Sequence, residues 1–363
     1  MKKRVLVLSS FPAPYRVAVF KGLASYYDMD LFFGLSTNES RNTDWYSKSD
    51  TFSFEVLDNK KSKELFNHAL KCINSYDFVL AYDINQIPAF RLVYCCQKNN
   101  VPYFVNCDGA FLHNNPIKNY VKKLLFKKAT GCFSSGTSAT KYFLKYGVSL
   151  DRIFKHNFSS LEKKDIISAP LTKDEKDDIK RQLGIPNKKT AIAVGQFIKR
   201  KGFDSLLLAW SLLKNRDSQL IIVGGGKERA KYEKIIKKNK LSNVILIDYL
   251  PKDELKKYYL ASDFFVLPTH EDVWGLVVNE AMACGLPVIT TNKCNAGIEL
   301  VQNCINGYIV LDGDLSDLAI RIDYLFKNEK LALEMSKNNL NLIKEYTIEN
   351  IVLAHHRVID KLI

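Results

Sequence analysis

The sequence predicts an α/β protein with two doubly wound domains, each built on a parallel sheet. Apolar runs of strand length alternate with stretches of helical apolar spacing, which predicts parallel strands joined by right-handed crossovers. A chain of 363 residues also exceeds the usual size of a single hydrophobic core. A charged segment separates the two halves, so we expect a first domain at 1–165, a linker at 166–188, a second domain at 189–345 and a last helix at 346–363.

In the first half, strands are expected where short apolar runs end at turn residues, at 4–10, 29–33, 78–82, 102–107 and 131–134. Helices are expected where apolar residues recur at helical spacing, at 17–26, 63–75, 86–99, 117–128 and 138–146. Two stretches are expected as loops. Residues 11–16 contain two prolines that fix the backbone, and residues 36–54 are polar and irregular.

The second half repeats the alternation. Apolar runs predict strands at 190–195, 219–223, 244–251, 264–267 and 287–290. A helix is expected to start at Gly202, and a short Ala- and Met-rich helix is expected to stop at Gly285. Amphipathic spacing predicts further helices at 252–262, 315–326, 330–346 and 348–363.

The composition is that of a soluble globular protein, with 47% hydrophobic and 25% charged residues. No run approaches the ~18 consecutive apolar residues of a membrane-spanning helix, and the apolar run after Met1 is too short for a secretion signal. The eight cysteines are scattered without the spacing of metal ligands. We therefore expect reduced thiols in a cytosolic enzyme, and no metal site.

Positive charge is concentrated in the first half. Residues 1–200 contain 32 Lys and Arg against 18 Asp and Glu, whereas residues 201–363 contain 21 of each, so the whole net charge of +14 lies in the first 200 residues. Such a surface can bind nucleic acid or an anionic membrane. Because the sequence has no nucleic-acid motif, we expect no nucleic-acid partner and favour a membrane surface.

A basic amphipathic stretch at 117–128 is the candidate membrane contact, although a solvated face over a packed apolar stripe is the commoner arrangement. Its candidate membrane residues are Lys118, Lys122, Lys123, Lys127 and Lys128.

The most informative stretch is Thr269–Ile289, where an acidic loop and a short helix lie between two apolar runs. Open α/β sheets bind ligands beyond the carboxyl ends of their strands. Gly275 stands where the helix begins, so its missing side chain and the unpaired amides of the first turn suit a phosphate. Asp272 and Glu280 add two carboxylates, of which Glu280 can accept two sugar hydroxyls. The pattern fits a nucleoside diphosphate with a sugar beyond it.

Asp272 and Glu280, with seven residues between them that include Trp274–Leu276, resemble the E-x7-E signature of retaining glycosyltransferase family 4. The resemblance implies the GT-B fold, in which two Rossmann-like domains have a cleft between them and the last helix crosses back to the first domain. The first acid of the signature is usually Glu, so either Asp272 or the adjacent Glu271 fills that role here. The resemblance is specific over about 190–310 and concerns only the architecture of the first half.

The segment Thr190–Gly202 resembles the family's G-R-x4-K-G element, in which an Arg and a Lys hold the diphosphate. Lys201 matches the Lys, whereas Gln196 stands at the Arg position and Arg200 is the candidate substitute. The candidate catalytic residues are accordingly Asp272 or Glu271, Lys201 and Asp108. The candidate donor-binding residues are Glu280 on the ribose, Gly275 and Leu276 on the diphosphate, Gly195, Gln196 and Arg200 beside it, and Tyr249 and Leu250 at the base.

The same resemblance implies that the acceptor is bound by the first domain. Family members often carry a His or an acid after the strand that ends near Asn106, so Asp108 is our candidate there and His113 a second one. A simple Asp-Gly turn is the alternative. The loop 11–16 faces the cleft in GT-B folds, so Tyr15 and Arg16 are candidates for acceptor contact. The alternative is that Arg16 only caps a surface.

We therefore expect a retaining glycosyltransferase that moves a sugar from a UDP- or GDP-linked donor to a hydroxyl of a glycan or lipid-linked acceptor. The expected process is cell-surface polysaccharide synthesis, such as that of a capsule or O-antigen. The family needs no metal ion, so no cofactor is expected besides the nucleoside-diphosphate sugar, which is the donor substrate. The expected location is the cytoplasm, with peripheral attachment to the inner face of the cell membrane.

Two alternatives are kept. One is a sugar-nucleotide epimerase or a non-catalytic nucleotide-sugar binder on the same scaffold, although epimerases of this architecture lack the E-x7-E stretch. The other is a dinucleotide-dependent oxidoreductase, which rests only on the glycine turn Gly224–Gly226.

Overall fold

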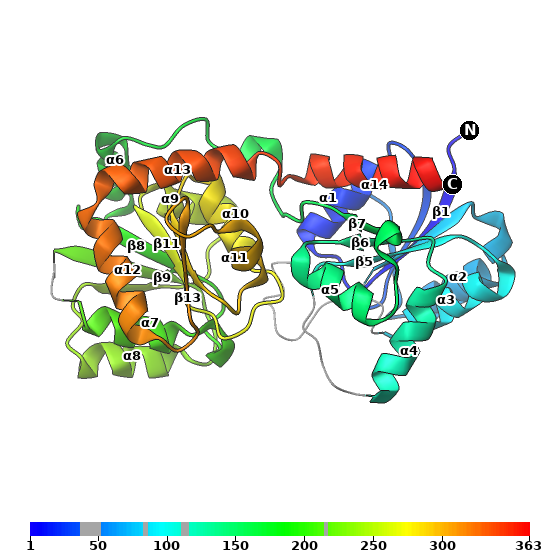
Figure 1. The fold of residues 1–363 in the computed structure, drawn as a ribbon, viewed down its shortest axis with the longest axis horizontal. Helices are drawn as coiled ribbons and strands as arrows, with labels where there is room; N and C mark the ends of the chain where they lie inside the picture. Colours follow the sequence, from blue (N-terminus) through cyan, green and yellow to red (C-terminus); the bar gives the residue numbers. More distant parts are fainter. Residues whose placement is uncertain (37–51, 83–85, 110–115, 214–216) are drawn as a thin grey trace. The chain divides into compact units, whose positions relative to one another are not determined.

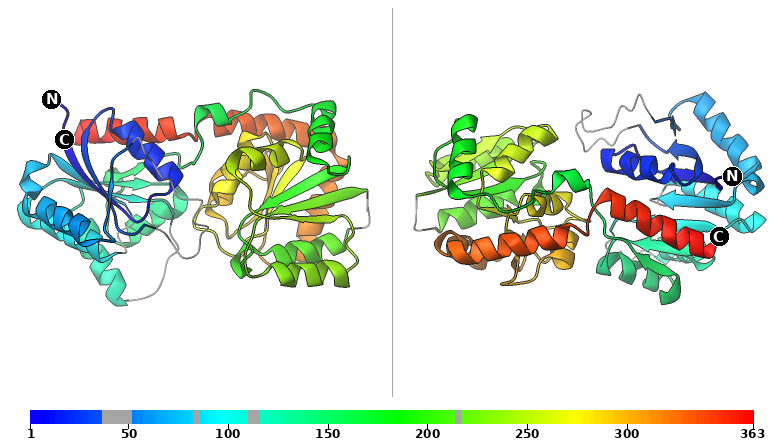
Figure 2. Two further views of the ribbon diagram at one scale, coloured as in Figure 1. Left: turned by 180° about the vertical axis from the view of Figure 1, so that it is seen from behind. Right: turned by 90° about the horizontal axis from the view of Figure 1, so that it is seen from above.

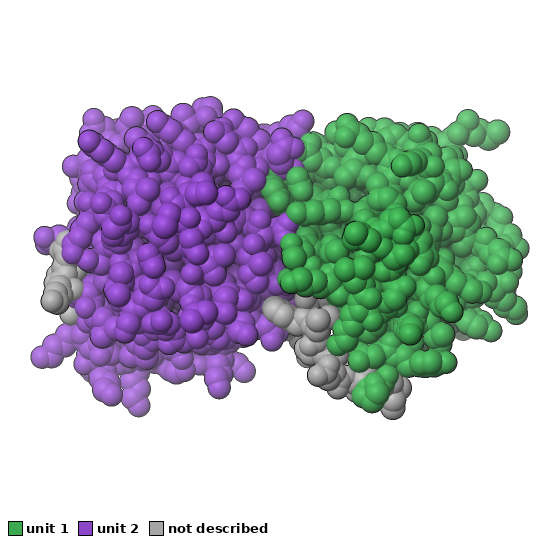
Figure 3. All heavy atoms as spheres, in the orientation of Figure 1, with its two compact units in different colours: residues 1–160, 346–363 green, residues 161–345 purple. Residues whose placement is uncertain are grey.

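The computed structural model describes residues 1–36, 52–82, 86–109, 116–213 and 217–363. They form two compact units, residues 1–160 with 346–363, and residues 161–345 (Figure 3). Within each unit, helices cover both faces of one sheet (Figure 1 and Figure 2). The segment 166–188, expected as a linker, belongs to the second unit and contains helix α6 (Lys173–Leu183).

The first unit has a seven-stranded sheet in the order β3-β2-β1-β4-β5-β6-β7, and all its neighbouring strands are parallel. The strands are β1 (Arg4–Ser9), β2 (Asp28–Phe33), β3 (Glu55–Val56), β4 (Phe78–Tyr82), β5 (Tyr103–Cys107), β6 (Gly131–Ser134) and β7 (Ile153–Lys155). The helices are α1 (Pro14–Leu23), α2 (Lys60–Lys71), α3 (Ile87–Asn99), α4 (Pro116–Lys127), α5 (Thr137–Lys145) and α14 (Ile348–Leu362).

The helices divide between the two faces of this sheet because every central strand is apolar on both sides. Leu6, Val79 and Val105 face the cluster that α2 to α5 complete. On the other face α1 and α14 lie side by side, and Gly22 gives the room that the close approach of Val352 requires. The last helix of the chain is thus part of the core of the first unit (Figure 1).

One local prediction in this unit is wrong. Residues 11–16 were expected as a loop, but α1 already begins at Pro14. Proline suits the first turn of a helix, where its missing N–H would have no partner and its fixed φ is already helical. Tyr15 and Arg16 therefore lie in the first turn of a helix. Residues 37–51 of the other expected loop lie outside the described residues.

The second unit has a six-stranded sheet in the order β10-β9-β8-β11-β12-β13, again with parallel neighbours. The strands are β8 (Lys189–Val194), β9 (Ser218–Val223), β10 (Val244–Ile247), β11 (Phe264–Leu267), β12 (Val288–Thr291) and β13 (Gly307–Val310). Besides α6, the helices are α7 (Phe203–Ser211), α8 (Arg229–Lys238), α9 (Lys252–Leu260), α10 (Leu276–Ala283), α11 (Asn295–Leu300), α12 (Leu315–Lys327) and α13 (Glu329–Ile343). The expected α/β class with two parallel-sheet domains is confirmed.

In the second unit the loops after β8 and β11 meet in a close backbone contact. The chain after β8 makes a 3₁₀ turn at Lys199–Lys201 and reaches Gly202, whose φ is 68°. A Cβ on Gly202 would lie 2.0 Å from the carbonyl oxygen of Pro268, so only glycine fits there. The Arg200 carbonyl accepts hydrogen bonds from the Thr269 hydroxyl and the His270 amide, each at 2.8 Å.

We predict that Gly202→Ala destabilises the second unit by about 2–4 kcal/mol, because left-handed strain and a clash with a fixed carbonyl add together. Gly184→Ala is the matched control. Gly184 has a φ of 65°, but nothing lies within 4 Å of its added Cβ, so that variant should cost only about 1 kcal/mol. Urea unfolding of the two variants measures the difference. Equal losses would show that the contact with Pro268 contributes nothing.

Two buried histidines lie at the contact of α14 with the first sheet. His355 stacks on Phe133 with ring centroids 3.8 Å apart, and His156 lies 5.0 Å from His355 between the same centroids. Both are 2% exposed or less. Burial, together with the nearby Arg16 charge, lowers the pKa of His156 to about 3. Burial likewise lowers the pKa of His355, so both imidazoles are neutral in the folded protein.

The first unit should therefore lose stability in acid. A histidine that cannot be protonated when folded stabilises the protein fully above its unfolded pKa, near 6.5, and this contribution is lost as the pH falls toward the folded pKa. For His156 the loss between pH 8 and pH 5 should be about 2 kcal/mol. Urea unfolding at both pH values should show a smaller loss for His156→Phe than for the wild type. His68→Gln, at an exposed position, should behave like the wild type. An identical pH dependence in His156→Phe would contradict this account.

Candidate functional site

The candidate donor site lies at the carboxyl edge of the second sheet. The strand order reverses between β8 and β11, because β9 and β10 continue to one side of β8 and β12 and β13 to the other. Loops that leave two neighbouring parallel strands in opposite directions open a crevice at that point, which is where such folds bind ligands. The loop after β8 carries Lys201, and the loop after β11 carries Asp272.

An ion pair joins these two loops. The Lys201 ammonium donates to Oδ2 of Asp272, and Nη1 of Arg200 lies 3.8 Å from Oδ1 of the same carboxylate. Lys201 is 8% and Asp272 7% exposed, so this charge pair is largely removed from water. Arg200 also donates to the carbonyl of Glu271 at 3.1 Å. The sequence analysis identified these four residues as separate candidates, and the structure places them in contact.

Backbone contacts hold the acidic loop in place. The Asp272 amide donates to the carbonyl of Lys293 at 2.9 Å, and the amide of Asn295 donates to the Asp272 carbonyl at 3.3 Å. Gly275, with a φ of 101°, caps α10, and a Cβ there would lie 2.8 Å from the Cys294 sulfur. Leu276 is the first residue of α10, so the amides of the first turn are directed away from the helix beside the ion pair.

Glu280 lies one turn further along α10, with a half-buried carboxylate. Its Oε2 accepts a hydrogen bond from the hydroxyl of Tyr259 at 3.2 Å. Burial raises the pKa of Glu280, while that hydrogen bond and the charge of Lys252 oppose the rise. The Tyr259 side chain comes from α9 and packs edge-on against Phe265 of β11. One carboxylate oxygen is thus oriented by the protein.

The remaining donor-site candidates lie at the ends of neighbouring strands. Gly195 follows β8 directly, and a Cβ on it would lie 3.6 Å from Cδ and Cε of Lys201, so the lysine stem crosses it closely. Gln196 is half-buried beside it. Tyr249, which is 44% exposed, and Leu250 lie between β10 and α9. Glu271 is exposed at the start of the acidic loop.

Sequence reasoning missed a second polar pair at this edge. His270 Nδ1 lies 2.6 Å from Oδ1 of Asp312, which follows β13. Both side chains are partly exposed, 32% and 24%. The available signal was their position, since each is a polar residue shortly after an apolar strand of a parallel sheet.

In the first unit the structure joins three of the acceptor-side candidates. Asp108 follows β5 and accepts hydrogen bonds from Tyr15 at 3.2 Å and from Asn106 at 2.7 Å, and it forms an ion pair with Arg16. Arg16 is 3% exposed, with its guanidinium 4.4 Å from the ring centroid of Tyr82. The alternative that Arg16 caps a surface is therefore wrong. His113 lies outside the described residues.

The basic stretch forms helix α4, but its faces differ from the expected ones. The apolar residue Leu124 is 48% exposed rather than packed, and Tyr120 is 65% exposed. Lys122, expected on the solvent face, lies over the rings of Tyr142 and Tyr146, 5.0 and 5.7 Å from their centroids. Lys123, Lys127 and Lys128 are exposed, and the side chain of Lys118 lies outside the described part of the chain.

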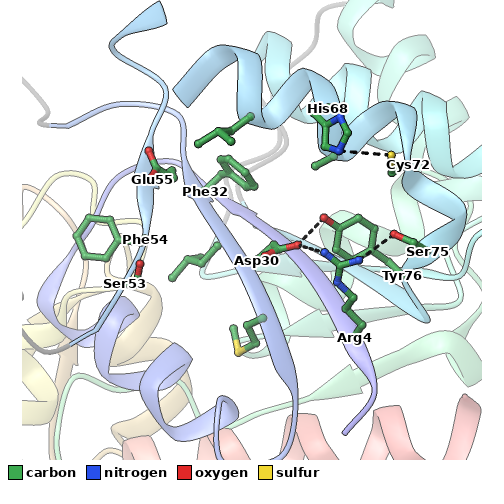
Figure 4. A pocket seen from close by; sticks show the side chains of 14 residues that line it. Arg4, Asp30, Phe32, Ser53, Phe54, Glu55, His68, Cys72, Ser75 and Tyr76 are labelled. Atoms are coloured by element: carbon green, nitrogen blue, oxygen red, sulfur yellow. Dashed lines mark hydrogen bonds and ion pairs between the residues drawn. The ribbon is translucent and has the colours of Figure 1, made fainter. Parts of the chain in front are cut away.

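A separate pocket of about 540 Å³ lies in the first unit, between β2 and α2 (Figure 4). Two of its charged groups are bound to each other. Arg4 forms an ion pair with Asp30 at 2.9 Å, and Asp30 also accepts from Tyr76 at 2.6 Å. Arg4 begins β1, so this pocket lies toward the amino ends of the strands, whereas Asp108 follows a carboxyl end. Nothing in it indicates a particular ligand.

Two searches for particular features concern the described residues alone. Among them, no helix has the length and apolar composition needed to cross a bilayer. Nor does that part of the chain contain three or more His, Cys, Asp or Glu residues grouped as metal ligands.

Comparison with known proteins gives one family match, which lies within the second unit, and several similar proteins. Residues 175–341 match the family model for glycosyl transferases group 1. An uncharacterized glycosyltransferase of Haemophilus influenzae is 32% identical over 177 residues, which are 48% of this chain and 49% of that protein. An N,N'-diacetylbacillosaminyl-diphospho-undecaprenol alpha-1,3-N-acetylgalactosaminyltransferase of Campylobacter jejuni is 23% identical over 247 residues, 68% of this chain and 64% of that protein. The chain thus spans about half the length of the Haemophilus relative.

The similarity of fold extends over the whole chain. The structure of Anabaena HepE in complex with UDP matches with a TM-score of 0.81 at 16% sequence identity, and the match covers 100% of both chains. The fold is therefore GT-B. Over residues 175–341 the chain is similar to glycosyl transferases group 1, and it is also similar to proteins named as glycosyltransferases.

Proposed function

We propose that the protein is a retaining glycosyltransferase that transfers a sugar from a nucleoside-diphosphate sugar to a hydroxyl of a glycan or lipid-linked acceptor. One observation carries the proposal. Along the carboxyl edge of the second sheet lie, one after another, two cations, the N-terminus of α10 and the carboxylate of Glu280. That is the order of charges needed by a diphosphate followed by a ribose. HepE, which shares the fold, has been solved with UDP-glucose.

In this proposal each donor group has its own partner. Lys201, Arg200 and the amides of Gly275 and Leu276 bind the diphosphate. Glu280 accepts hydrogen bonds from the ribose hydroxyls, with Tyr259 holding one of its oxygens. The main chain at Tyr249 and Leu250 contacts the base.

The chemistry then depends on charge that develops on the leaving group. As the bond between the sugar and the diphosphate breaks, negative charge grows on the phosphate oxygen, and fixed cations and helix amides stabilise it more than they stabilise the bound donor. In our proposal these cations and amides stabilise the leaving diphosphate without a metal ion. The leaving phosphate takes the acceptor proton on the same face of the sugar, which retains the anomeric configuration.

The two acids of the loop have different roles in this proposal. Both oxygens of Asp272 are directed at cations. The exposed carboxylate of Glu271 is therefore the better candidate for a contact with the sugar hydroxyls.

We propose that the first unit binds the acceptor. Asp108, held by Tyr15, Arg16 and Asn106, is a rigid polar group at the carboxyl edge of that sheet. The excess of positive charge in the first 200 residues suits an anionic acceptor or an anionic membrane surface. The Campylobacter relative is named for a diphospho-undecaprenol acceptor. A lipid-linked acceptor in cell-surface polysaccharide synthesis, such as that of a capsule or O-antigen, at the cytoplasmic face of the membrane, is accordingly our proposal.

The function is tested by incubating the protein with UDP- and GDP-sugars and lipid-linked acceptors, with and without EDTA. We expect transfer that EDTA does not abolish, and a product whose anomeric configuration matches that of the donor. Release of free sugar alone, or epimerised donor without transfer, would favour the epimerase.

We predict that Glu280→Gln weakens UDP or GDP binding by about 1.5–3 kcal/mol, the contribution of hydrogen bonds to a charged group. Glutamine keeps an oxygen for Tyr259, so the fold should be preserved. Calorimetry should show that the wild type prefers UDP to 2′-deoxy-UDP and that the variant has lost most of this preference. A variant that kept the full preference would remove Glu280 from the ribose.

For the membrane contact, the test changes Lys123 and Lys127 of α4 and the adjacent Lys128 to Gln together. Each exposed lysine near an anionic surface contributes about 1 kcal/mol of attraction, so co-sedimentation with anionic liposomes at low salt should fall strongly. The control changes the exposed Lys234, Lys237 and Lys238 of α8 to Gln, which removes the same charge from the second unit. If both triple variants sediment like the wild type, α4 is not a membrane contact.

A further inference from the structure

The two cations at the candidate donor site already have an anion within the protein. The side chains of Lys201 and Asp272 are each 10% exposed, and that of Arg200 is 44% exposed. A counter-ion so close to a phosphate-binding lysine weakens the field that an incoming anion experiences. With Asp272 ionised, the three side chains carry a net charge of +1, whereas the two cations alone would carry +2.

The counter-ion is also fixed where it lies. The main chain of Asp272 is hydrogen-bonded on both sides to the segment 293–295, so its Cα cannot move without breaking those bonds. Its carboxyl carbon would lie 3.6 Å from a Cβ on Gly275, so the side chain packs over the cap of α10. The Lys201 stem is held over Gly195, and its turn is packed against the Pro268 carbonyl through Gly202. Ion pair and phosphate site therefore share one rigid frame.

We propose that Asp272 is a built-in counter-ion that limits the affinity of this site for the nucleoside diphosphate and so permits its release after transfer. This inference rests on the proposed function. An enzyme that holds a leaving diphosphate with two uncompensated, partly buried cations would bind its product tightly, and product release would limit turnover. Asp272 offsets one cation. It acts on the ligand through Lys201 and is therefore a positioning residue.

A contact with the sugar and a counter-ion role predict different nucleotide affinities for Asp272→Asn. Asparagine has nearly the same shape and can still accept a hydrogen bond from Lys201, but it carries no charge. If Asp272 is the counter-ion, UDP or GDP should bind about tenfold more tightly to the variant, because an uncompensated cation faces the phosphates. Turnover should fall as release slows, and kcat/KM should fall less than kcat. A residue that touches only the sugar would leave UDP affinity unchanged, and a purely structural role would weaken it.

The experiment is calorimetry of UDP and GDP on the full chain for the wild type and four variants. Asp272→Glu retains the charge and should bind like the wild type, and Lys201→Ala should bind more weakly. Asp323→Asn removes a carboxylate paired with Lys327 on α12 and is the charge control. Tighter binding by Asp272→Asn alone supports the proposal, and unchanged or weaker binding overturns it. A wild-type protein that binds neither nucleotide overturns the proposed function itself.

Arg200→Gln keeps the test decisive if Asp272→Asn does not fold, because this side chain is half-exposed. With Lys201 neutralised by Asp272, removal of Arg200 leaves no net positive charge among the three side chains. The preference for UDP over uridine should then fall about tenfold or more, to the share that the helix amides of Gly275 and Leu276 supply. A preference for UDP close to that of the wild type would show that Lys201 acts as an uncompensated cation, and the proposal would be wrong.

Discussion

The contact of Gly202 with the carbonyl of Pro268 is the constraint on which the candidate site depends. It holds the backbones of the loops after β8 and β11 in contact at the point where the strand order reverses. That contact fixes the positions of Lys201 and Arg200, so both side chains can pair with Asp272. A side chain on residue 202 would separate the loops, because a carbonyl oxygen in a packed backbone cannot move aside.

In the first unit, polar groups from distant parts of the chain also meet. Asp108 collects a phenol, a guanidinium and an amide that come from α1 and β5. Beneath them, the last helix of the chain supplies His355, which stacks on Phe133 and stays neutral through burial. Residues at the two ends of the chain therefore complete one core, in which Arg16 and His355 are buried.

The fold comparison matches the whole chain, whereas the family model matches only part of it, and this difference has a physical reason. The fold matches over the whole chain at 16% identity, because a parallel sheet covered by helices requires only apolar strands and amphipathic helices. The family model matches only residues 175–341, which contain the cations, the capping glycine and Glu280. A phosphate site needs particular residues at particular positions, whereas a covered sheet does not.

The sequence by itself predicted ten of the thirteen strands in the described residues, the two parallel sheets and the residues of the second unit that carry charge or glycine at the strand ends. It missed the short strands β3, β7 and β13. Phe78–Tyr82 and Phe264–Leu267 were predicted without error, because a continuous apolar run between turn residues admits few alternatives. The tertiary structure decided what periodicity cannot encode. It buried Arg16 on Tyr82, set Lys122 over two tyrosines, exposed Leu124, and directed both oxygens of Asp272 at cations. Each of these depends on a partner distant in the chain, and the local pattern around a residue carries no information about which partner the fold will bring to it.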